Sequence, residues 1–230
     1  NSFVFGERDL EFFKTFNMHN DIQIMGSPSY YEESISSSNN KKAMYLLSSN
    51  IGNLWHNTTE SKFLSPDSIR EWNRLKKVIS YFKSKDDWTL VIKPHPARGV
   101  FLHSPIDEYL SDNKYKNISM DNFRTTSPKY FSKFNLLIFD YPETGYLQAI
   151  AAGHTKIVSF YEGQYINTEF SKDLSSHCFA QTDESFIELI DKSLTMKTTI
   201  EENCRQKFLI NYGQRGSEQE LLKKVLSILN

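Results

Sequence analysis

Apolar residues along the chain fall into two kinds of pattern that alternate with each other. Short continuous apolar runs, of which 88–92 and 135–140 are the clearest, have the length of a buried strand. Between such runs lie segments in which apolar residues recur every three or four positions, the spacing of an amphipathic helix. Further strands are predicted at 3–5, 22–25, 43–47, 118–120, 155–160 and 178–180. Helices are predicted at 7–16, 66–83, 105–110, 127–134, 144–152, 183–194, 199–211 and 217–229. This alternation predicts parallel pairing through βαβ crossovers, and hence an α/β fold with a Rossmann-like sheet flanked by helices.

The longest predicted helix has a recognisable start and one apolar face. Ser65 suits the N-cap position, and Pro66 suits the first helical turn. We expect the apolar stripe of this helix to be part of the core. Its members are Ile69, Trp72, Leu75, Val78, Ile79 and Phe82.

A polar segment divides the chain into two unequal parts. Residues 29–42 are rich in Ser, Asn and Glu and poor in apolar residues, which is typical of a linker. We therefore expect residues 1–28 to be the end of a preceding domain or an interdomain segment. Residues 43–230 are expected to form one Rossmann-like domain with extra helices at its C-terminal end. Because the sequence starts with Asn rather than Met, one hypothesis is that it is a piece of a longer protein.

Composition and charge narrow the class of protein. A chain of 230 residues with 39% hydrophobic content can form one α/β domain with a full core. A net charge of −1 argues against nucleic acid as the main partner. No apolar run approaches the roughly 18 residues of a membrane span, and residues 1–20 lack a signal-peptide pattern. The two cysteines, Cys178 and Cys204, make no disulfide framework, so the cytoplasm is the expected compartment.

The first candidate for chemistry is Lys-Pro-His-Pro, which follows the apolar run 88–92. Pro94 and Pro96 end the strand and hold His95 in an extended turn. Lys93 and Arg98 flank the imidazole. Ligands of open α/β sheets bind outside the carboxyl ends of the strands, so this cluster suits an anion such as a phosphate. An ordinary Pro-rich surface turn explains the same four residues about equally well.

A second strand end makes the site hypothesis stronger. The apolar run 135–140 is followed by a short loop with Thr144 and Gly145, and then by a predicted helix that stops at Gly153. A helix start placed after a strand offers free backbone N–H groups to an anion. Ser49 lies just past the predicted strand 43–47, where its hydroxyl either binds a ligand or caps the turn.

Several common motifs are missing from the sequence. It contains no Gly-x-Gly-x-x-Gly, no Walker loop and no Gly-x-Ser-x-Gly. His, Cys and Asp residues show no metal-ligand spacing. His154 and Glu162 lie near predicted strand or helix ends, but we expect them to be surface loop residues.

The order of these features resembles the C-terminal half of two-domain GT-B transferases. Gly-Ser-Pro follows a short strand, a new strand ends in Ser, and a long helix precedes Lys-Pro-His-Pro. The likeness covers roughly residues 22–175. It is strongest to bacterial surface-polysaccharide enzymes that share a His-Pro element: the CDP-glycerol glycerophosphotransferase-like group, the capsule Kdo transferases and the bacterial sialyltransferases. The second shared element is a strand that ends in Asp140 and leads into a small-residue loop and a helix.

The resemblance implies roles for the candidate residues. Residues 43–230 would bind the donor nucleotide, His95 would contact its phosphate as the catalytic candidate, and Thr144 and Gly145 would lie at the phosphate-binding helix start. The related enzymes usually have Ser-Ser or Ser-Thr where this sequence has Glu143-Thr144. A carboxylate repels a phosphate, so we expect Glu143 to accept a hydrogen bond from a ribose hydroxyl or to pair with a nearby cation.

The function that the resemblance implies is glycosyl or polyol-phosphate transfer in bacterial surface-polysaccharide or capsule biosynthesis. The donor would be of the CMP, CDP or UDP type and the acceptor a saccharide or a lipid-linked saccharide, with no cofactor and no metal. Peripheral association with the inner membrane is compatible with it. The catalytic base would belong to the N-terminal half of the enzyme. Two alternatives remain open: a non-catalytic GT-B-like domain that binds a partner, and an enzyme like a UDP-sugar epimerase.

Overall fold

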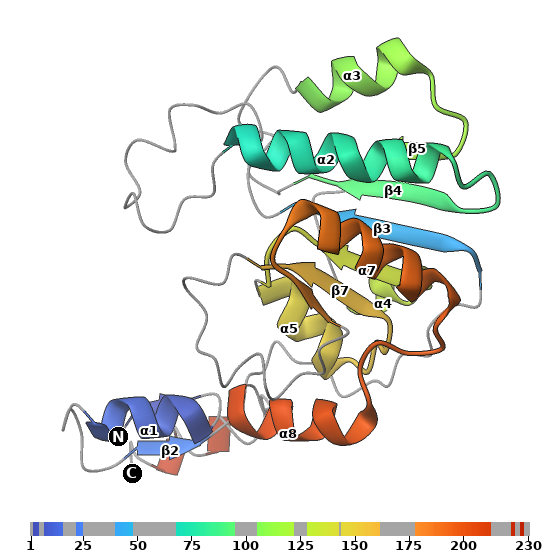
Figure 1. The fold of residues 1–230 in the computed structure, drawn as a ribbon. Coiled ribbons are helices and arrows are strands. Elements are labelled where there is room, and N and C mark those ends of the chain that lie inside the picture. Colours follow the sequence, from blue (N-terminus) through green and yellow to red (C-terminus); the bar gives the residue numbers. More distant parts are fainter. Residues whose placement is uncertain are drawn as a thin grey trace.

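A computed structural model gives the fold of the chain (Figure 1). It describes residues 2–4, 7–15, 22–24, 40–47, 68–94, 105–121, 128–142, 144–161, 178–212, 222–223 and 226–227. The predicted linker 29–42 and the predicted cap at residues 65 and 66 fall largely or wholly outside these ranges.

Six parallel strands form the main sheet, in the order β5-β4-β3-β6-β7-β8. Their bounds are β3 Lys42–Leu46, β4 Thr89–Lys93, β5 Ile118–Met120, β6 Leu136–Phe139, β7 Ile157–Phe160 and β8 Phe179–Ala180. The chain moves outward from β3 to β4 and β5, and outward in the other direction from β6 to β7 and β8. The confirmed fold class is therefore an α/β, Rossmann-like sheet.

Helices cover both faces of this sheet (Figure 1). One face packs against α2 Ser68–Lys83, α3 Pro105–Asn113 and α7 Asp183–Thr195. The other packs against α4 Pro128–Phe131, α5 Thr144–Ala151 and α8 Glu202–Tyr212. Because both faces are covered, the central strands read as continuous apolar runs rather than as an alternation.

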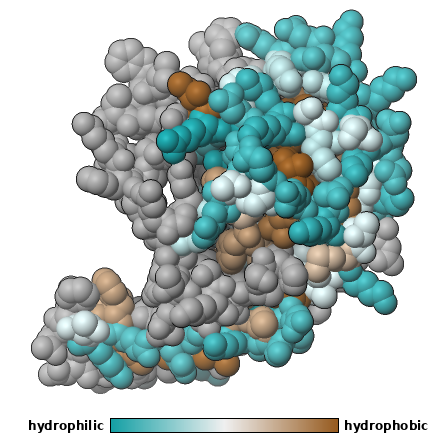
Figure 2. Space-filling model, in the orientation of Figure 1, coloured by the Kyte–Doolittle hydropathy of each residue, from teal (hydrophilic) through white to brown (hydrophobic). Residues whose placement is uncertain are grey.

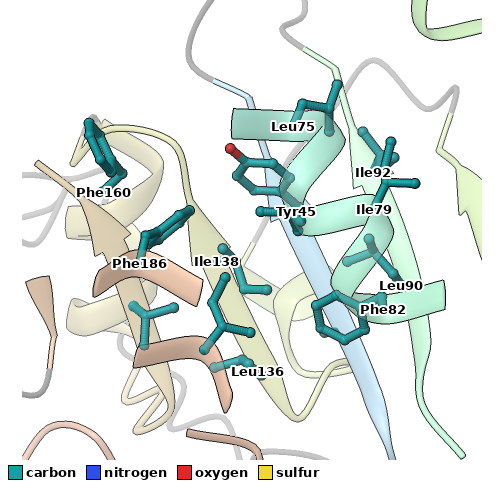
Figure 3. Packing of buried hydrophobic residues seen from close by; sticks show 14 of the residues in the cluster. Tyr45, Leu75, Ile79, Phe82, Leu90, Ile92, Leu136, Ile138, Phe160 and Phe186 are labelled. Carbon is teal, nitrogen blue, oxygen red and sulfur yellow. The ribbon is translucent and has the colours of Figure 1, made fainter. Parts of the chain in front are cut away.

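Alternate residues of each strand divide the core into two layers. Tyr45, Leu136 and Ile138 point toward α2 and α7, whereas their neighbours Leu137 and Phe139 point toward α5. Figure 3 shows the first layer, with Tyr45 of β3 beside Leu75 of α2. The apolar runs that predicted the strands are thus the same residues that form the core.

The N-terminal residues form a second, two-stranded sheet with one helix. Strand β1 Ser2–Val4 pairs in parallel with β2 Ile22–Ile24, and α1 Glu7–Thr15 connects them. Helix α1 contacts α8. The three elements agree with the predicted strand, helix and strand of this segment, while the domain division at residue 28 stays a prediction.

Two details of the sequence-based expectations are corrected by the structure. Ile69 was expected in the core, but it is 65% exposed because it lies in the first turn of α2, on the side away from the sheet. His154 was expected in a surface loop, but it is fully buried. Of the predicted helix 217–229, the structure describes residues 222–223 and 226–227, which are helical.

Candidate functional site: the carboxyl edge of the sheet

The carboxyl ends of all six strands lie at one edge of the sheet, because the strands are parallel. At the centre of this edge β3 and β6 are neighbours. The chain continues from β3 to β4 on one side and from β6 to β7 on the other. Such a crossing point is where open α/β sheets bind ligands. Lys93, Asp140, Thr144 and Gly145 all belong to this central part of the edge.

Lys93 is a buried ammonium group at the end of β4. The residue is 2% exposed, and Leu47 N donates to its carbonyl oxygen at 3.0 Å, which fixes the backbone there. Its Nζ lies 3.4 Å from Oδ2 of Asp121, which is itself buried after β5. Within the described residues, Nζ makes this ion pair but no hydrogen bond. A buried side chain whose hydrogen-bonding groups the protein does not use calls for an explanation, and a bound ligand is one such explanation.

A tyrosine supports the carboxylate partner of Lys93. Tyr130 of α4 donates its hydroxyl to Asp121 Oδ2 at 2.6 Å, and its ring centroid lies 5.9 Å from Lys93 Nζ. Burial, together with the bond to Asp121, raises the pKa of Tyr130 well above its usual value, so it remains a donor. Asp121 and Tyr130 were not recognised in the sequence, because neither belongs to a motif and their contact with Lys93 is set by the fold.

Helix α5 begins at the same edge. Thr144 is its first residue and is exposed, and Gly145 is partly buried beside the ring of Phe139. A Cβ added to Gly145 would lie 3.6 Å from Cε1 of Phe139, which is ordinary packing. The first turn of α5 contains no acidic side chain, and the first N–H groups of any helix have no partner inside it. This start therefore presents the positive end of a helix dipole.

Lys93 and the start of α5 lie on the same face of the sheet. Lys93 is opposite Leu46 in the register of β3 and β4, and Leu46 is opposite Phe139 in the register of β3 and β6. This row spans two strand spacings, roughly 10 Å. Leu46 and Phe139 both pack in the layer of α5, as does Val91, which is two residues before Lys93. Lys93, Thr144 and Gly145 thus lie at one edge and on one face of the sheet, while the site as a whole stays a prediction.

The other predicted site residues fall outside the described part of the chain. These are His95, Arg98, Ser49 and Glu143. That His95 faces the same hollow as Thr144 stays a prediction. Among the described residues, no three His, Cys, Asp or Glu side chains gather as a metal site would require. Nor does any helix in the described ranges have the length and apolar content to span a membrane.

A buried ionic network lies behind this edge, on the opposite face of the sheet. Asp140, which follows β6, accepts from Tyr45 Oη at 2.9 Å and from Arg74 Nη1 at 2.6 Å. Asp183, at the start of α7, accepts from Arg74 Nε at 3.2 Å. Burial raises the pKa of Tyr45 well above its usual value, and the charge of Asp140 raises it further. The sequence drew attention to Asp140 as a strand end, but Arg74 was missed because its partners lie 66 and 109 residues away.

A hollow of about 710 Å³ lies beside α2 and is lined in part by Arg74, Phe160 and Asp183 of this network, on the face of the sheet opposite the start of α5. Its lining includes Arg70, Asn73 and Lys77 of α2, Tyr109 of α3 and Thr182 before α7. Figure 2 shows that the described part of this face is mainly hydrophilic. The hollow therefore reaches the carboxyl ends of β7 and β8, on the face of the sheet opposite the start of α5.

Comparison with known proteins supports the fold assignment. No protein-family model and no curated protein matches the sequence. Among solved structures, TarM matches 99% of this chain and 43% of its own, with a TM-score of 0.51 and 14% identity. The UDP-GlcNAc 2-epimerase from Methanocaldococcus jannaschii matches with a TM-score of 0.54 and 11% identity over 99% of this chain and 62% of its own. The spinosyn rhamnosyltransferase SpnG matches with a TM-score of 0.50 and 11% identity over 91% of this chain and 53% of its own.

These similarities concern the fold alone, since identity is low throughout. The chain spans about 43 to 62% of the length of these proteins. The expected Rossmann-like parallel sheet flanked by helices, similar to GT-B structures, is thereby confirmed.

Proposed function

We propose that this chain supplies the nucleotide-donor site of a GT-B-type glycosyltransferase. One observation carries the proposal: Lys93, a buried ammonium that makes no hydrogen bond within the described residues, lies on the same face and edge of the sheet as the start of α5. A cation and the N-terminal amides of a helix at one topological switch point suit the diphosphate or phosphate of a nucleotide. The GT-B fold of the neighbouring structures supports the reaction class.

The chemistry of transfer explains why such groups are needed. When a sugar or polyol phosphate leaves a nucleotide donor, negative charge develops on the departing phosphate. Lys93 and the amides of residues 144–146 would stabilise this charge, with His95 and Arg98 as further candidates from the turn after β4. Glu143 would accept hydrogen bonds from a ribose. Ser49, which follows β3 in the sequence, would make a hydrogen bond to the nucleotide-sugar donor.

The finer parts of the proposal follow the sequence resemblance. The donor would carry CMP, CDP or UDP, the acceptor would be a saccharide or a lipid-linked saccharide, and the product would be a bacterial surface polysaccharide. Catalysis would be metal-independent and cytoplasmic, with the base supplied by an N-terminal half. The acceptor side of the reaction then depends on residues outside this domain.

The proposal is tested by isothermal titration of the protein with CMP, CDP, UDP and GDP. We expect one of them to bind, and Lys93→Met and His95→Ala to weaken that binding at least tenfold. Lys156→Met is the matched control, because Lys156 is also buried but precedes β7 at the opposite edge, where its Nζ donates to Asn135 Oδ1 at 2.7 Å. If none of the four nucleotides binds, or if Lys156→Met weakens binding as much as Lys93→Met, the proposal is wrong.

A second candidate function is epimerisation of a UDP-sugar. It is favoured by the fold similarity to the archaeal UDP-GlcNAc 2-epimerase. Incubation with UDP-GlcNAc in the absence of any acceptor separates the two functions: an epimerase converts the sugar at its second carbon, whereas a transferase leaves it unchanged. The third reading, a non-catalytic partner-binding domain, predicts a large apolar patch. The mainly hydrophilic face shown in Figure 2 does not favour such a patch there.

A further inference from the structure

Arg74 is the centre of a buried cluster that joins four elements at the carboxyl edge. Its side chain, on α2, is 7% exposed, and its Cζ lies 3.3 Å from the ring centroid of Phe160 at the end of β7. Its Nη1 bonds Asp140 after β6 and its Nε bonds Asp183 at the start of α7. The guanidinium is therefore held in one orientation by two carboxylates and an aromatic face.

Asp140 is the more deeply buried of the two carboxylates, with a side chain 1% exposed. It accepts bonds from two side chains, Tyr45 and Arg74, and its backbone N–H donates to Leu46 O at 3.0 Å. Burying two charges costs free energy, and apolar side chains of similar volume often stabilise a core equally well. A charged pair fixes direction as well as proximity, because the hydrogen bonds specify where each atom lies.

The residue before Asp140 links this cluster to the start of α5. Phe139 points to the opposite face, where its ring makes edge contacts with Phe131 and Tyr146 at centroid distances of 6.4 and 5.4 Å. It also borders Gly145. The dipeptide 139–140 is thus held from both faces of the sheet, and the chain enters the turn to α5 in a fixed direction.

We propose that Arg74 is a positioning residue for the anion site, acting through Asp140 on the turn that leads into α5. The inference rests on the proposed function of the start of α5 as a phosphate site. Arg74 does not reach that site itself, because it lies on the other face of the sheet. Its effect on ligand binding is therefore indirect: it sets where the backbone amides of residues 144–146 lie relative to Lys93.

The experiment compares Asp140→Asn and Arg74→Lys with Asp183→Asn. The last variant is the matched control, because it removes a carboxylate from the same guanidinium on the α7 side, away from the turn. Two quantities are measured for each protein: hydrogen exchange of the amides of residues 148–151, which donate to the first turn of α5, and the Kd for the nucleotide that the wild-type protein binds.

We expect Asp140→Asn and Arg74→Lys to speed exchange of these amides at least tenfold and to weaken nucleotide binding by a similar factor. Asp183→Asn should leave both quantities near those of the wild-type protein. Exchange at 148–151 that is unchanged in Arg74→Lys, or equally fast in Asp183→Asn, overturns the inference. Should Asp140→Asn fail to fold, Arg74→Lys carries the same comparison, since it keeps the charge and loses the forked geometry.

Failure of the proposed function has a different signature. If the wild-type protein binds no nucleotide, the donor-site proposal is wrong, while the exchange comparison still decides whether Arg74 positions the start of α5.

Discussion

Because the imidazole of His154 is buried, we predict that the protein loses folding stability in mild acid. The residue is fully buried after α5, its Nε2 lies 3.0 Å from the carbonyl oxygen of Phe134, and its Nδ1 has no hydrogen-bond partner among the described residues. Because a carbonyl oxygen only accepts, Nε2 carries the proton and Nδ1 is bare. Protonation of Nδ1 would place a charge in a buried site, and burial disfavours the charged form.

The magnitude follows from the difference in pKa between the folded and unfolded chains. Burial lowers the pKa of His154 to about 4, from an ordinary value of 6.5, and the nearby charge of Lys156 contributes to the lowering. The unfolded chain therefore binds the proton first as the pH falls, and folding stability is lost between pH 6.5 and about 4. The full loss is about 3 kcal/mol, of which about 2 kcal/mol falls between pH 7 and pH 5.

Urea denaturation at pH 7, 6 and 5 and constant ionic strength measures this effect against His154→Gln. Gln keeps an amide donor for Phe134 O and does not titrate, while the other five histidines are common to both proteins and cancel in the difference. We expect the wild-type protein to lose about 2 kcal/mol more than the variant from pH 7 to pH 5. If the two proteins lose stability in parallel, the buried imidazole is not the titrating group. His154→Asn serves in the same way if the Gln variant does not fold.

Two further predictions concern the core and a helix cap. Phe82→Ala should lower the free energy of unfolding by about 3–5 kcal/mol, because Phe82 is fully buried in the layer between α2 and the sheet. Phe12→Ala is the control: Phe12 is 59% exposed, so the free energy of unfolding should change by less than about 0.5 kcal/mol. Both are measured by urea unfolding, and equal effects would contradict the assignment of the core. Thr182→Ala should cost about 1 kcal/mol, because Thr182 Oγ1 accepts from Ser185 N at 3.1 Å at the start of α7. Thr195→Ala, at the other end of that helix, is its control, and an equal loss there would count against a capping role.

The sequence was informative wherever local pattern decides structure. The apolar runs before Pro94 and Tyr141 became β4 and β6, and the loop after Asp140 led into α5 as expected. These features succeed because a buried parallel strand must be apolar on both faces, and because Pro and small residues end such strands.

The sequence was silent where the partner of a residue lies far away in the chain. Lys93 was expected as a ligand contact, but its pairing with Asp121 depends on the neighbouring strand β5. Arg74 occupies a polar position next to the apolar stripe of α2, and only the fold brings Asp140 to it. Ile69 was counted with that stripe because it precedes Trp72 by three residues, yet it lies on the opposite side of the helix from Val78 and is exposed.

The two outermost strands of the main sheet, β5 and β8, have only three and two residues. A strand at the edge of a sheet has unpaired backbone groups, to which a strand of a second chain can bond. Edge strands as short as these offer very few such groups. We therefore expect this domain to resist edge-to-edge association of its sheets at high concentration. Its contacts with other molecules should depend on side chains rather than on strand addition.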